Sequence, residues 1–325
     1  MRFDVANPTT GALLYVAPAR DRLSARAAVS RAAEVGRDFR AGGGSGVQLV
    51  ADLADLLLER ADELAWRSAT ELGVPVASGV RSVVEVAGRL TTLAESDCDA
   101  LGGEVAWCEV EPGRPWWTLI PVAQGLVAGA AVAVLCRGSG AGVAAELEAL
   151  AQQAGAPRGL VTGLVVEDHG RSFVDGLDGV VGLRGPVAER AVVRVDGEVE
   201  RVAAEVVTEL CRWAGQDRGA PTRVQVDEAE QDAFIETLEL AMMEVVCGDP
   251  RDPETLLGPL SGHHAREIVH RRVFEAVRRG ARLRRGGVLP EGPGAFYPLT
   301  IVESIDGDGL WERGIGGPVV AVRRG

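Results

Sequence analysis

The sequence predicts an α/β fold that contains a parallel sheet. Its first third has the periodicity of helices, whereas short β-prone runs alternate with helices after Cys98. An apolar run at 130–136, a glycine-rich turn and a helical segment at 143–153 are followed by another apolar run at 159–166. This order is a βαβ unit, which places its two strands parallel in one sheet. The chain has 325 residues, enough for two packed domains or one large one.

Helices are expected to fill the chain before Cys98. The alanine-rich segment from Arg22 to Arg40 is a good helix former and stops at the glycine-rich break at 42–46. A longer helix should follow, because its leucines recur at three- and four-residue spacing: Leu49, Leu53, Leu56, Leu57 and Leu64. A third helix should have Ser78 as its cap, and its inner face is expected to hold Val83, Val84, Val86 and Leu90.

The rest of the chain is expected to alternate strands with helices. The remaining β-prone runs, and so the remaining expected strands, lie at 104–110, 116–120, 191–195, 221–226 and 281–284. Helical patterns lie at 199–213, 228–246 and 263–279. This alternation supports the same α/β class.

Composition limits the function. The formal net charge is −13, which argues against a nucleic acid or an anionic membrane as partner, because both need a basic face. The chain has no lysine, so it has neither a Schiff-base lysine nor a phosphate-loop lysine. The five cysteines form no Cys-x-x-Cys pair, and the most apolar stretch, at 126–136, is too short to span a bilayer. Since no signal peptide is recognised either, a cytoplasmic protein with reduced thiols is expected.

Seven short fragments, in the same order along the chain, resemble motifs of the aldehyde dehydrogenase superfamily. Residues 7–11 resemble N-P-x-T-G, residues 71–75 resemble E-T-G-K-P, and residues 128–136 resemble the A-A-G-N-x-V-V-L-K-P strand. Residues 215–224 resemble G-Q-x-C-x-A-P-T-R-V, and residues 248–260 resemble G-D-P…G-P-L. Residues 294–297 resemble G-x-F-Y, and residues 317–319 stand in the place of the G-P-V that ends E-E-I-F-G-P-V.

This resemblance implies a Rossmann-like cofactor-type domain at 1–204 and a truncated catalytic-type α/β domain at 205–325. It also implies a reaction in which a cysteine thiolate attacks an aldehyde and NAD or NADP accepts a hydride. An asparagine that stabilises the oxyanion and a glutamate that acts as base complete that chemistry.

The groups that this reaction needs are missing at the matching positions. The nucleophile position, two residues after Gln216, is Arg218, a permanently charged side chain that cannot attack a carbonyl. Asn7 is the only asparagine, so the oxyanion asparagine of the family's P-W-N segment cannot be present. Residues 116–121 run almost directly into 125–129, and the loop that would carry this asparagine is therefore interpreted as deleted. Glu189 is the only acidic candidate for the base between 182 and 195.

The cofactor contacts and the C-terminal part of the family pattern also differ. Arg137 stands in the region of the lysine that holds the adenosine ribose, and residues 313–316 replace E-E-I-F. The chain ends before the family's last catalytic-domain elements and its oligomerisation strand, which the resemblance therefore implies are absent.

Some residues remain as candidate sites. Arg137, Gly138, Ser139 and Gly140 form a turn between a strand and a helix, and Gly182 takes the place of the family's F-T-G-S turn. Backbone N–H groups at such a turn could hold a dinucleotide phosphate, although a glycine-rich turn is also simply a tight turn. Cys211, the thiol nearest to Arg218, lies about two helical turns away and is expected to be a small buried side chain.

Other conspicuous residues are expected to be structural. His263, His264 and His270 are assigned to a helix surface, because nothing at ligand spacing completes a metal site. Met242 and Met243 are expected in the core. Trp116 and Trp117 are expected to face solvent or a partner, since the deletion beside them would uncover them.

Three functions remain open after the sequence is read. The favoured one is a non-catalytic structural or regulatory subunit of an active, full-length aldehyde dehydrogenase, with no metal and no required cofactor. It is favoured because nucleophile, oxyanion donor, base and cofactor contacts are lost together. The alternative is a residual or repurposed NAD(P)-dependent oxidoreductase that acts on an aldehyde through Cys211 or the Gly138 turn. A decaying gene product without a selected role is the third.

Overall fold

The computed structural model describes residues 2–96, 101–166, 177, 179–183, 192–217 and 219–325. Contacts divide the chain into two compact units. The first contains Met1–Ala6, Leu13–Ala65 and Gly79–Pro186, and the second contains Asn7–Ala12, Trp66–Ser78 and Val187–Gly325. The boundary expected near residue 204 falls inside helix α8 (Val199–Arg212), which lies wholly in the second unit. The boundary near residue 204 separates the two domains that the resemblance implies, and a division by contacts does not test it, so it stays a prediction.

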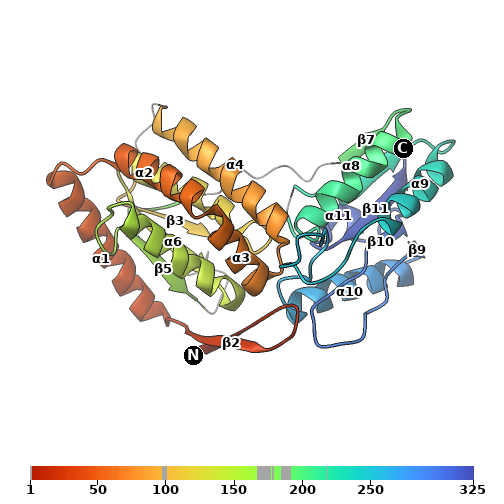
Figure 1. Ribbon diagram of the computed structural model, residues 1–325, viewed down its shortest axis with the longest axis horizontal. Coiled ribbons are helices and arrows are strands. Elements are labelled where there is room, and N and C mark those ends of the chain that lie inside the picture. Colours follow the sequence, from red (N-terminus) through yellow and green to blue (C-terminus); the bar gives the residue numbers. More distant parts are fainter. Residues whose placement is uncertain (1, 97–100, 167–176, 178, 184–191, 218) are drawn as a thin grey trace. The chain divides into compact units, whose positions relative to one another are not determined.

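The first unit is built on a parallel four-stranded sheet (Figure 1). Its strands are β3 (Val105–Glu109), β4 (Ala131–Cys136), β5 (Val161–Val165) and β6 (Val180–Gly182), in the order β5-β4-β3-β6. All three pairings are parallel, which confirms the sheet type expected from the βαβ pattern. All six residues of β4 are buried, as expected for a central strand of a parallel sheet. The strand order is that of the first four strands of a Rossmann fold.

Helices connect and cover this sheet. The helix α5 (Leu119–Val127) links β3 to β4, and α6 (Ala141–Gln153) links β4 to β5. The helix α1 (Arg22–Ala41) packs on β4, and a Cβ placed on Gly36 would lie only 3.2 Å from the Cβ of Ala131. The helix α2 (Gly46–Glu59) packs against α5 and α6. A hairpin of β1 (Arg2–Ala6) and β2 (Leu13–Pro18) precedes α1, and the sequence had not indicated its strands.

The N-terminal helices differ from expectation in three places. The expected long helix is two helices, α2 and α3 (Ala61–Leu72), which meet at Arg60. The helix α4 (Val76–Ala94) starts two residues before Ser78, directly after Pro75, so Ser78 is not its cap. Val84 is 48% exposed, because a helical period cannot place it on the same face as its buried neighbour Val83.

The run at 116–120 is not a strand. Pro115–Thr118 form a short 3-10 helix, η1, and Leu119 starts α5. Pro115 takes the first helical position, where a missing N–H group has no cost. Short apolar runs do not distinguish a buried helix from a buried strand, which explains the wrong assignment. The helices η1 and α5 complete the connection from β3 to β4. This connection is therefore intact, although the sequence suggested that a loop of the family is deleted here.

The second unit is built around a mixed five-stranded sheet. Its strands are β7 (Val192–Val195), β8 (Arg223–Val226), β9 (Arg282–Arg285), β10 (Thr300–Glu303) and β11 (Val319–Arg324), in the order β7-β8-β11-β10-β9. The edge strand β9 is antiparallel to β10, and the other pairings are parallel. The helices α8 and α9 (Gln231–Met243) lie on one side of the sheet and α10 (His263–Arg278) on the other (Figure 1).

The sequence anticipated most of this second unit. The strands expected at 191–195, 221–226 and 281–284 are confirmed as β7, β8 and β9, and the three expected helices as α8, α9 and α10. The strands β10 and β11 and the short helix α11 (Leu310–Arg313) were not expected. Leu210, Phe234 and Ile301 are fully buried in the core of this unit. None of the helices in the described ranges is long and apolar enough to cross a membrane.

Candidate functional site

The glycine-rich turn lies where the sequence places it, between β4 and α6. Arg137 is exposed, and Gly138–Gly140 form a 3-10 turn, η2, with Ser139 at its centre, which leads directly into α6. Other protein atoms occupy the space next to its glycines, where a side chain would lie. A Cβ placed on Gly138 would lie 3.0 Å from the Cβ of Phe3 in β1, and one on Gly140 would lie 3.1 Å from a methyl carbon of Val110.

This packing bears on the dinucleotide binding that the sequence suggested for this turn. A phosphate cradle needs glycines whose missing side chains leave room for the ligand, and here Phe3 and Val110 take that room. The first four residues of α6 are also buried. The turn therefore does not fit a phosphate in this structure, and close packing accounts for its glycines. Phosphate binding at Arg137–Gly140 stays an untested prediction.

Gly182 is not brought to that turn. In the sheet, Gly182 is aligned with Trp107 of β3, and Trp107 is aligned with Ala133 of β4. Because Ala133 precedes Gly138 by five residues, Gly182 is not level with the turn in the sheet. The strand β3 also lies between β4 and β6. A Cβ on Gly182 would lie 3.0 Å from the indole nitrogen of Trp107. This glycine, too, permits close packing.

Trp116 and Trp117 follow β3 at the carboxyl edge of the parallel sheet, the edge where open α/β sheets bind ligands. The expectation that they face solvent is wrong, because Trp116 is fully buried and Trp117 is 9% exposed. The guanidinium carbons of Arg114 and Arg89 lie 3.6 Å and 4.6 Å from the ring centroid of Trp117, within range of cation–π attraction. Among the described residues, the indole N–H group of Trp117 and the hydroxyl of Thr118 have no hydrogen-bond partner.

Sequence reasoning missed this arginine–tryptophan cluster. Arg89 comes from α4 and Arg114 from the segment before η1, so only the folded chain brings them to one ring. A usable signal for the helix, although not for the burial of the tryptophans, was Pro115, because proline is favoured at the first helical position.

In the second unit, the chain leaves α8 through a defined turn towards the expected nucleophile position. The N–H group of Gly215 donates to the carbonyl of Leu210 at 2.8 Å, and that of Ala214 donates to the carbonyl of Cys211 at 3.2 Å. These are the two hydrogen bonds of a Schellman motif. Ala214 takes a left-handed φ of 49°, which no other non-glycine residue takes in the part of the chain that the structure describes.

The loop around the nucleophile position is held by Gln216. Its Oε1 accepts a hydrogen bond from the N–H group of Ser261 at 3.0 Å, and its Nε2 donates to the carbonyl of Trp213 at 3.3 Å. Beyond that position, the N–H group of Gly219 donates to the carboxylate of Asp217 at 3.1 Å. Arg218 itself lies outside the described residues, as does Glu189, the acidic candidate for the base.

Cys211 is buried, as expected. It is the penultimate residue of α8, is 5% exposed and belongs to the core of the second unit. Burial raises the pKa of its thiol to about 12. Because the thiolate is the nucleophilic form, this side chain is unreactive near neutral pH.

The other described cysteines are also protonated near neutral pH. Burial raises the pKa of Cys108 and of Cys136, both in the first unit, to about 12. Cys247, which is exposed in the loop after α9, has a pKa raised by desolvation and lowered in part by the charge of Arg285.

The histidine and methionine expectations are only partly correct. His263 and His264 are exposed on α10, whereas His270 is half-buried with its Nδ1 3.4 Å from the hydroxyl of Tyr297. Within the described ranges, no three His, Cys, Asp or Glu side chains are grouped as metal ligands. Met242 is buried, but Met243 is 65% exposed, because consecutive helical residues point in directions about 100° apart.

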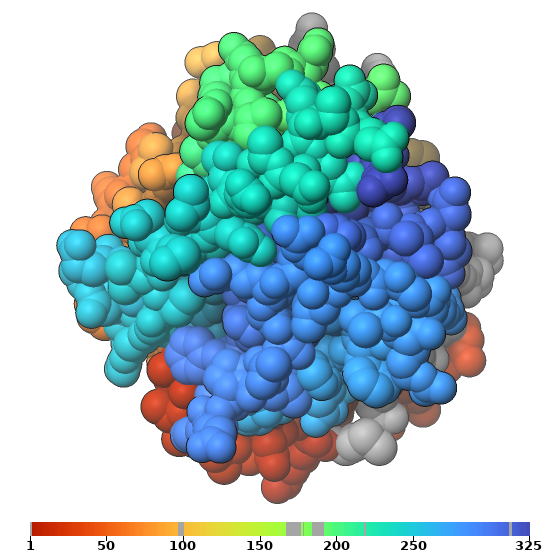
Figure 2. All heavy atoms as spheres, turned by 90° about the vertical axis from the view of Figure 1, so that its right-hand side faces the viewer, coloured from red at the N-terminus to blue at the C-terminus, as the bar shows by residue number. Residues whose placement is uncertain are grey.

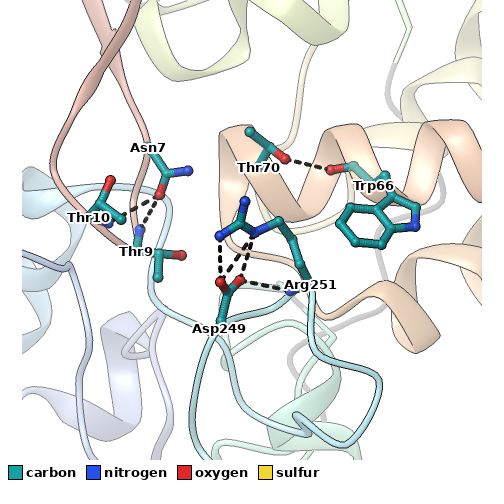
Figure 3. Close-up of polar contacts among 7 residues, drawn as sticks. All are labelled: Asn7, Thr9, Thr10, Trp66, Thr70, Asp249 and Arg251. Carbon is teal, nitrogen blue, oxygen red and sulfur yellow. Dashed lines mark hydrogen bonds and ion pairs between the residues drawn. The ribbon is translucent and has the colours of Figure 1, made fainter.

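Several family-like fragments contact one another within the second unit. The first of these contacts joins the fragment at 7–11 to the fragment at 294–297. Asn7 shapes the turn at 7–11, since its side-chain oxygen accepts hydrogen bonds from the N–H groups of Thr9 at 2.8 Å and Thr10 at 3.1 Å (Figure 3). The N–H group of Ala295 donates to the carbonyl of Pro8 at 2.7 Å. A Cβ on Gly294 would lie 2.5 Å from the carbonyl oxygen of Thr9.

Two further contacts of the same kind join four other fragments of the second unit. A Cβ on Gly258 would lie 2.1 Å from the carbonyl oxygen of Gly73, and one on Gly215 would lie 1.9 Å from the carbonyl oxygen of Gly317. Near the first of these contacts, the carboxylate of Asp249 binds the guanidinium of Arg251 through both oxygens (Figure 3). The glycines of these fragments therefore permit close approach of distant backbone segments.

Comparison with known proteins identifies the family. A family model described as "Aldehyde dehydrogenase family" matches residues 182–324. An aldehyde dehydrogenase of Paenarthrobacter nicotinovorans is 28% identical over 302 residues, which cover 78% of this chain and 66% of that protein. A succinate-semialdehyde dehydrogenase [NADP(+)] of Mycolicibacterium paratuberculosis is 26% identical over 367 aligned residues, which cover 98% of this chain and 78% of that protein. Residues 182–324 thus match the aldehyde dehydrogenase family, and over most of its length the chain is similar to aldehyde dehydrogenases.

Solved structures of aldehyde dehydrogenases share its α/β fold. A succinic semialdehyde dehydrogenase from Streptococcus pyogenes, in complex with NADP+ as the cofactor, gives a TM-score of 0.86 at 19% identity over 99% of this chain and 81% of that one. An NAD+ complex of an aldehyde dehydrogenase from Bacillus cereus gives a TM-score of 0.87 at 18% identity over 100% of this chain and 76% of that one. The chain thus spans about two thirds to four fifths of the length of the proteins that it matches.

Proposed function

We propose that this chain is non-catalytic and serves as a structural or regulatory subunit of an active aldehyde dehydrogenase. The observation that carries the proposal is the state of the thiols. Arginine stands at the nucleophile position in the sequence, and the nearest thiol, that of Cys211, is buried in α8 with a pKa raised to about 12. A buried neutral thiol cannot attack an aldehyde carbon.

The retained packing supports a binding role. The turn after α8 keeps its Schellman hydrogen bonds, Gln216 still ties the loop to Ser261, and Gly215 still seats against Gly317. Any other residue at position 215 would bring a Cβ against the backbone of Gly317 and disrupt this contact. A sequence without a selected role would be expected to lose such contacts as readily as it loses reactive groups. A cytoplasmic location and a full-length dehydrogenase as partner are parts of the same proposal.

An NAD(P)-dependent oxidoreductase is the second candidate, and the strand order of the first unit favours it. The order β5-β4-β3-β6 is that of a dinucleotide-binding half, and the matched proteins include one solved with NADP+ and one with NAD+. It ranks second because the glycines at Gly138 and Gly140 are filled by apolar neighbours.

An activity assay separates the two candidates. The purified chain is incubated with NAD or NADP and with succinic semialdehyde or a simple aliphatic aldehyde, and reduced cofactor is followed by absorbance. The proposal expects the same background rate for the chain and for Cys211→Ala. Aldehyde-dependent reduced cofactor that disappears in Cys211→Ala would establish the oxidoreductase instead.

Co-expression tests the subunit role. The chain is produced with each full-length aldehyde dehydrogenase of its host, and the mixture is analysed by size exclusion with mass measurement. The expected result is a stable complex that changes the kcat or KM of the partner. A chain that binds none of these enzymes would refute the subunit role.

Thermal shift with about 1 mM nucleotide addresses the cofactor separately. A ligand held at 100 times its Kd raises stability by about 2.7 kcal/mol, which a melting curve resolves readily. The proposal expects no such shift with NAD or NADP, because the turn does not fit a phosphate. A clear shift would favour the second candidate.

A further inference from the structure

The first unit has a hollow at the amino edge of its parallel sheet. It lies between the end of α1 and the turn that leads from α6 into β5, and its volume is about 600 Å³, within the range of sites for small molecules. The end of α1 reaches this edge, because Gly36 packs on Ala131, the first residue of β4. Open α/β sheets bind dinucleotides at the opposite, carboxyl edge. The hollow is therefore separate from the turn at Arg137–Gly140, which follows β4.

Two ordered turns form the walls of this hollow. After α1, the N–H group of Gly44 donates to the carbonyl of Phe39 at 2.9 Å, and a Cβ on Gly44 would overlap the ring of Phe39, so the ring is fixed against the loop. After α6, the N–H group of Ala156 donates to the carbonyl of Ala151 at 2.9 Å, and Gly155 takes a φ of 100°, which favours glycine. Because both glycines lack a side chain, the walls leave the space between them open.

The side chains that line the hollow come from both walls. Val35, Asp38 and Phe39 stand at three- and four-residue spacing, so they share one face of α1. The turn after α6 adds Pro157 and Arg158. The lining therefore combines an aromatic ring and two apolar side chains with one carboxylate and one guanidinium.

The two charges of this lining have no partner in the fold. Asp38 and Arg158 are exposed, and neither forms an ion pair with the other or with any residue that the structure describes. The next residue before Asp38 differs in this respect, because Arg37 pairs with Glu104. A guanidinium binds a carboxylate through parallel N–H donors, and a carboxylate accepts hydrogen bonds from an ammonium group. Two opposite charges that line one hollow without meeting can therefore be bridged by a ligand that carries both.

We propose that this hollow binds a free α-amino acid with an aromatic or large apolar side chain. Arg158 binds the carboxylate of the ligand, Asp38 binds its ammonium group, and its side chain packs against Phe39 and Pro157. A ligand with a carboxylate alone would leave Asp38 without a partner, and an amine would leave Arg158 without one. A zwitterion satisfies both charges, which is why an amino acid is the ligand class that fits.

Isothermal titration calorimetry of the full chain with L-phenylalanine tests the inference. The expected Kd is below about 1 mM. Hydrocinnamate lacks the ammonium group and phenethylamine lacks the carboxylate, although both keep the ring, so each should bind at least about tenfold more weakly. L-alanine keeps both charges but lacks the ring, and it should also bind more weakly. These comparisons use the wild-type chain and so do not depend on the folding of any variant.

Single substitutions assign the two charges of the ligand to their partners. Asp38→Asn and Arg158→Gln should each weaken the binding of L-phenylalanine at least about tenfold. Asp38→Asn should bind hydrocinnamate no more weakly than wild type does, because a ligand without an ammonium group no longer leaves a carboxylate without a partner. As matched controls, Glu236→Gln in α9 and Arg271→Gln in α10 remove the same charges at exposed positions of the second unit and should leave binding unchanged. Figure 2 shows α9 in teal and α10 in blue at the surface.

Three results would each overturn the proposal. They are no binding of L-phenylalanine up to about 10 mM, equal binding of the analogues that lack one charge, and unchanged binding in both Asp38→Asn and Arg158→Gln. The amino-acid site does not depend on the subunit role proposed above. The aldehyde and cofactor assays use other ligands, so they judge the proposed function separately.

Discussion

Replacing Gly215 with alanine tests whether the family-like fragments are retained for packing. Gly215 has a φ of 63°, and this left-handed conformation costs a residue with a Cβ about 1–2 kcal/mol. The new Cβ would also lie 1.9 Å from the carbonyl oxygen of Gly317 and 2.9 Å from the nitrogen of Pro318. Both are backbone atoms, so the chain entering β11 must move, and overpacking of this kind costs about 1–3 kcal/mol more. The expected loss in the free energy of unfolding is therefore about 2–5 kcal/mol.

Gly307→Ala is the matched control. Gly307 lies in the same unit with a φ of 80°, but its Cβ would meet nothing within 4 Å. This variant should lose only the conformational part, about 1–2 kcal/mol. The difference between the two variants isolates the contact between Gly215 and Gly317.

Urea unfolding followed by tryptophan fluorescence measures both losses. The comparison is valid if the variants share the wild-type dependence of the free energy of unfolding on urea. Gly215→Ala should unfold at clearly lower urea than Gly307→Ala. Equal midpoints would refute the reasoning, because they would mean that the close approach at Gly317 adds nothing to the strain at a left-handed residue.

Three further predictions concern single side chains. Burial raises the pKa of the Cys211 thiol from 9.0 to about 12, so the unfolded chain loses this proton at lower pH than the folded chain does. The contribution of the neutral thiol to the free energy of unfolding is therefore fully present below pH 9 and is lost as the pH rises towards 12. Cys211→Ala should therefore flatten the fall in the free energy of unfolding above pH 9 in urea titrations, and an unchanged slope would contradict the burial. Arg60→Ala should cost about 2–3 kcal/mol, because it removes the guanidinium 2.8 Å from the Glu146 carboxylate, which is 7% exposed. At the exposed pair with Glu205, Arg201→Ala should cost less than about 1 kcal/mol in the same experiment, and equal losses would argue against the buried pair. Asn7→Ala should cost about 1–2 kcal/mol by removing the acceptor for two N–H groups, whereas Asn7→Asp keeps an oxygen there and should lose less; the reverse order in thermal melts would disprove the role of that oxygen.

Elements with a strong period or a buried apolar run could be predicted from sequence. The strand β4 is apolar at every position and lies between a glycine turn and another apolar run, so both its type and its parallel pairing followed. Where the local signal was ambiguous, the prediction failed. The run at 116–120 is as apolar as a strand but continues into α5, and Val84 follows Val83 on a helix that buries only one of them.

The candidate site was less predictable, because it depends on contacts between distant segments. The strand–turn–helix pattern of the sequence correctly placed Gly138 in a turn, but only the fold shows that Phe3 fills the space beside it. The same holds for Trp117, whose arginine neighbour on α4 lies 28 residues earlier in the chain. Cys211 was the easier case, since its place near the end of an amphipathic helix already indicated burial.

The contact between Pro8 and Ala295 sets an order on folding during synthesis. The turn at 7–11 leaves the ribosome before the segment that it packs against, which follows almost three hundred residues later. Contacts of such long sequence separation form slowly, because a large loop must close before any stabilisation is gained. The second unit should therefore be among the last parts to gain resistance to protease in a nascent chain, and its exposed apolar surface would depend on chaperones until then.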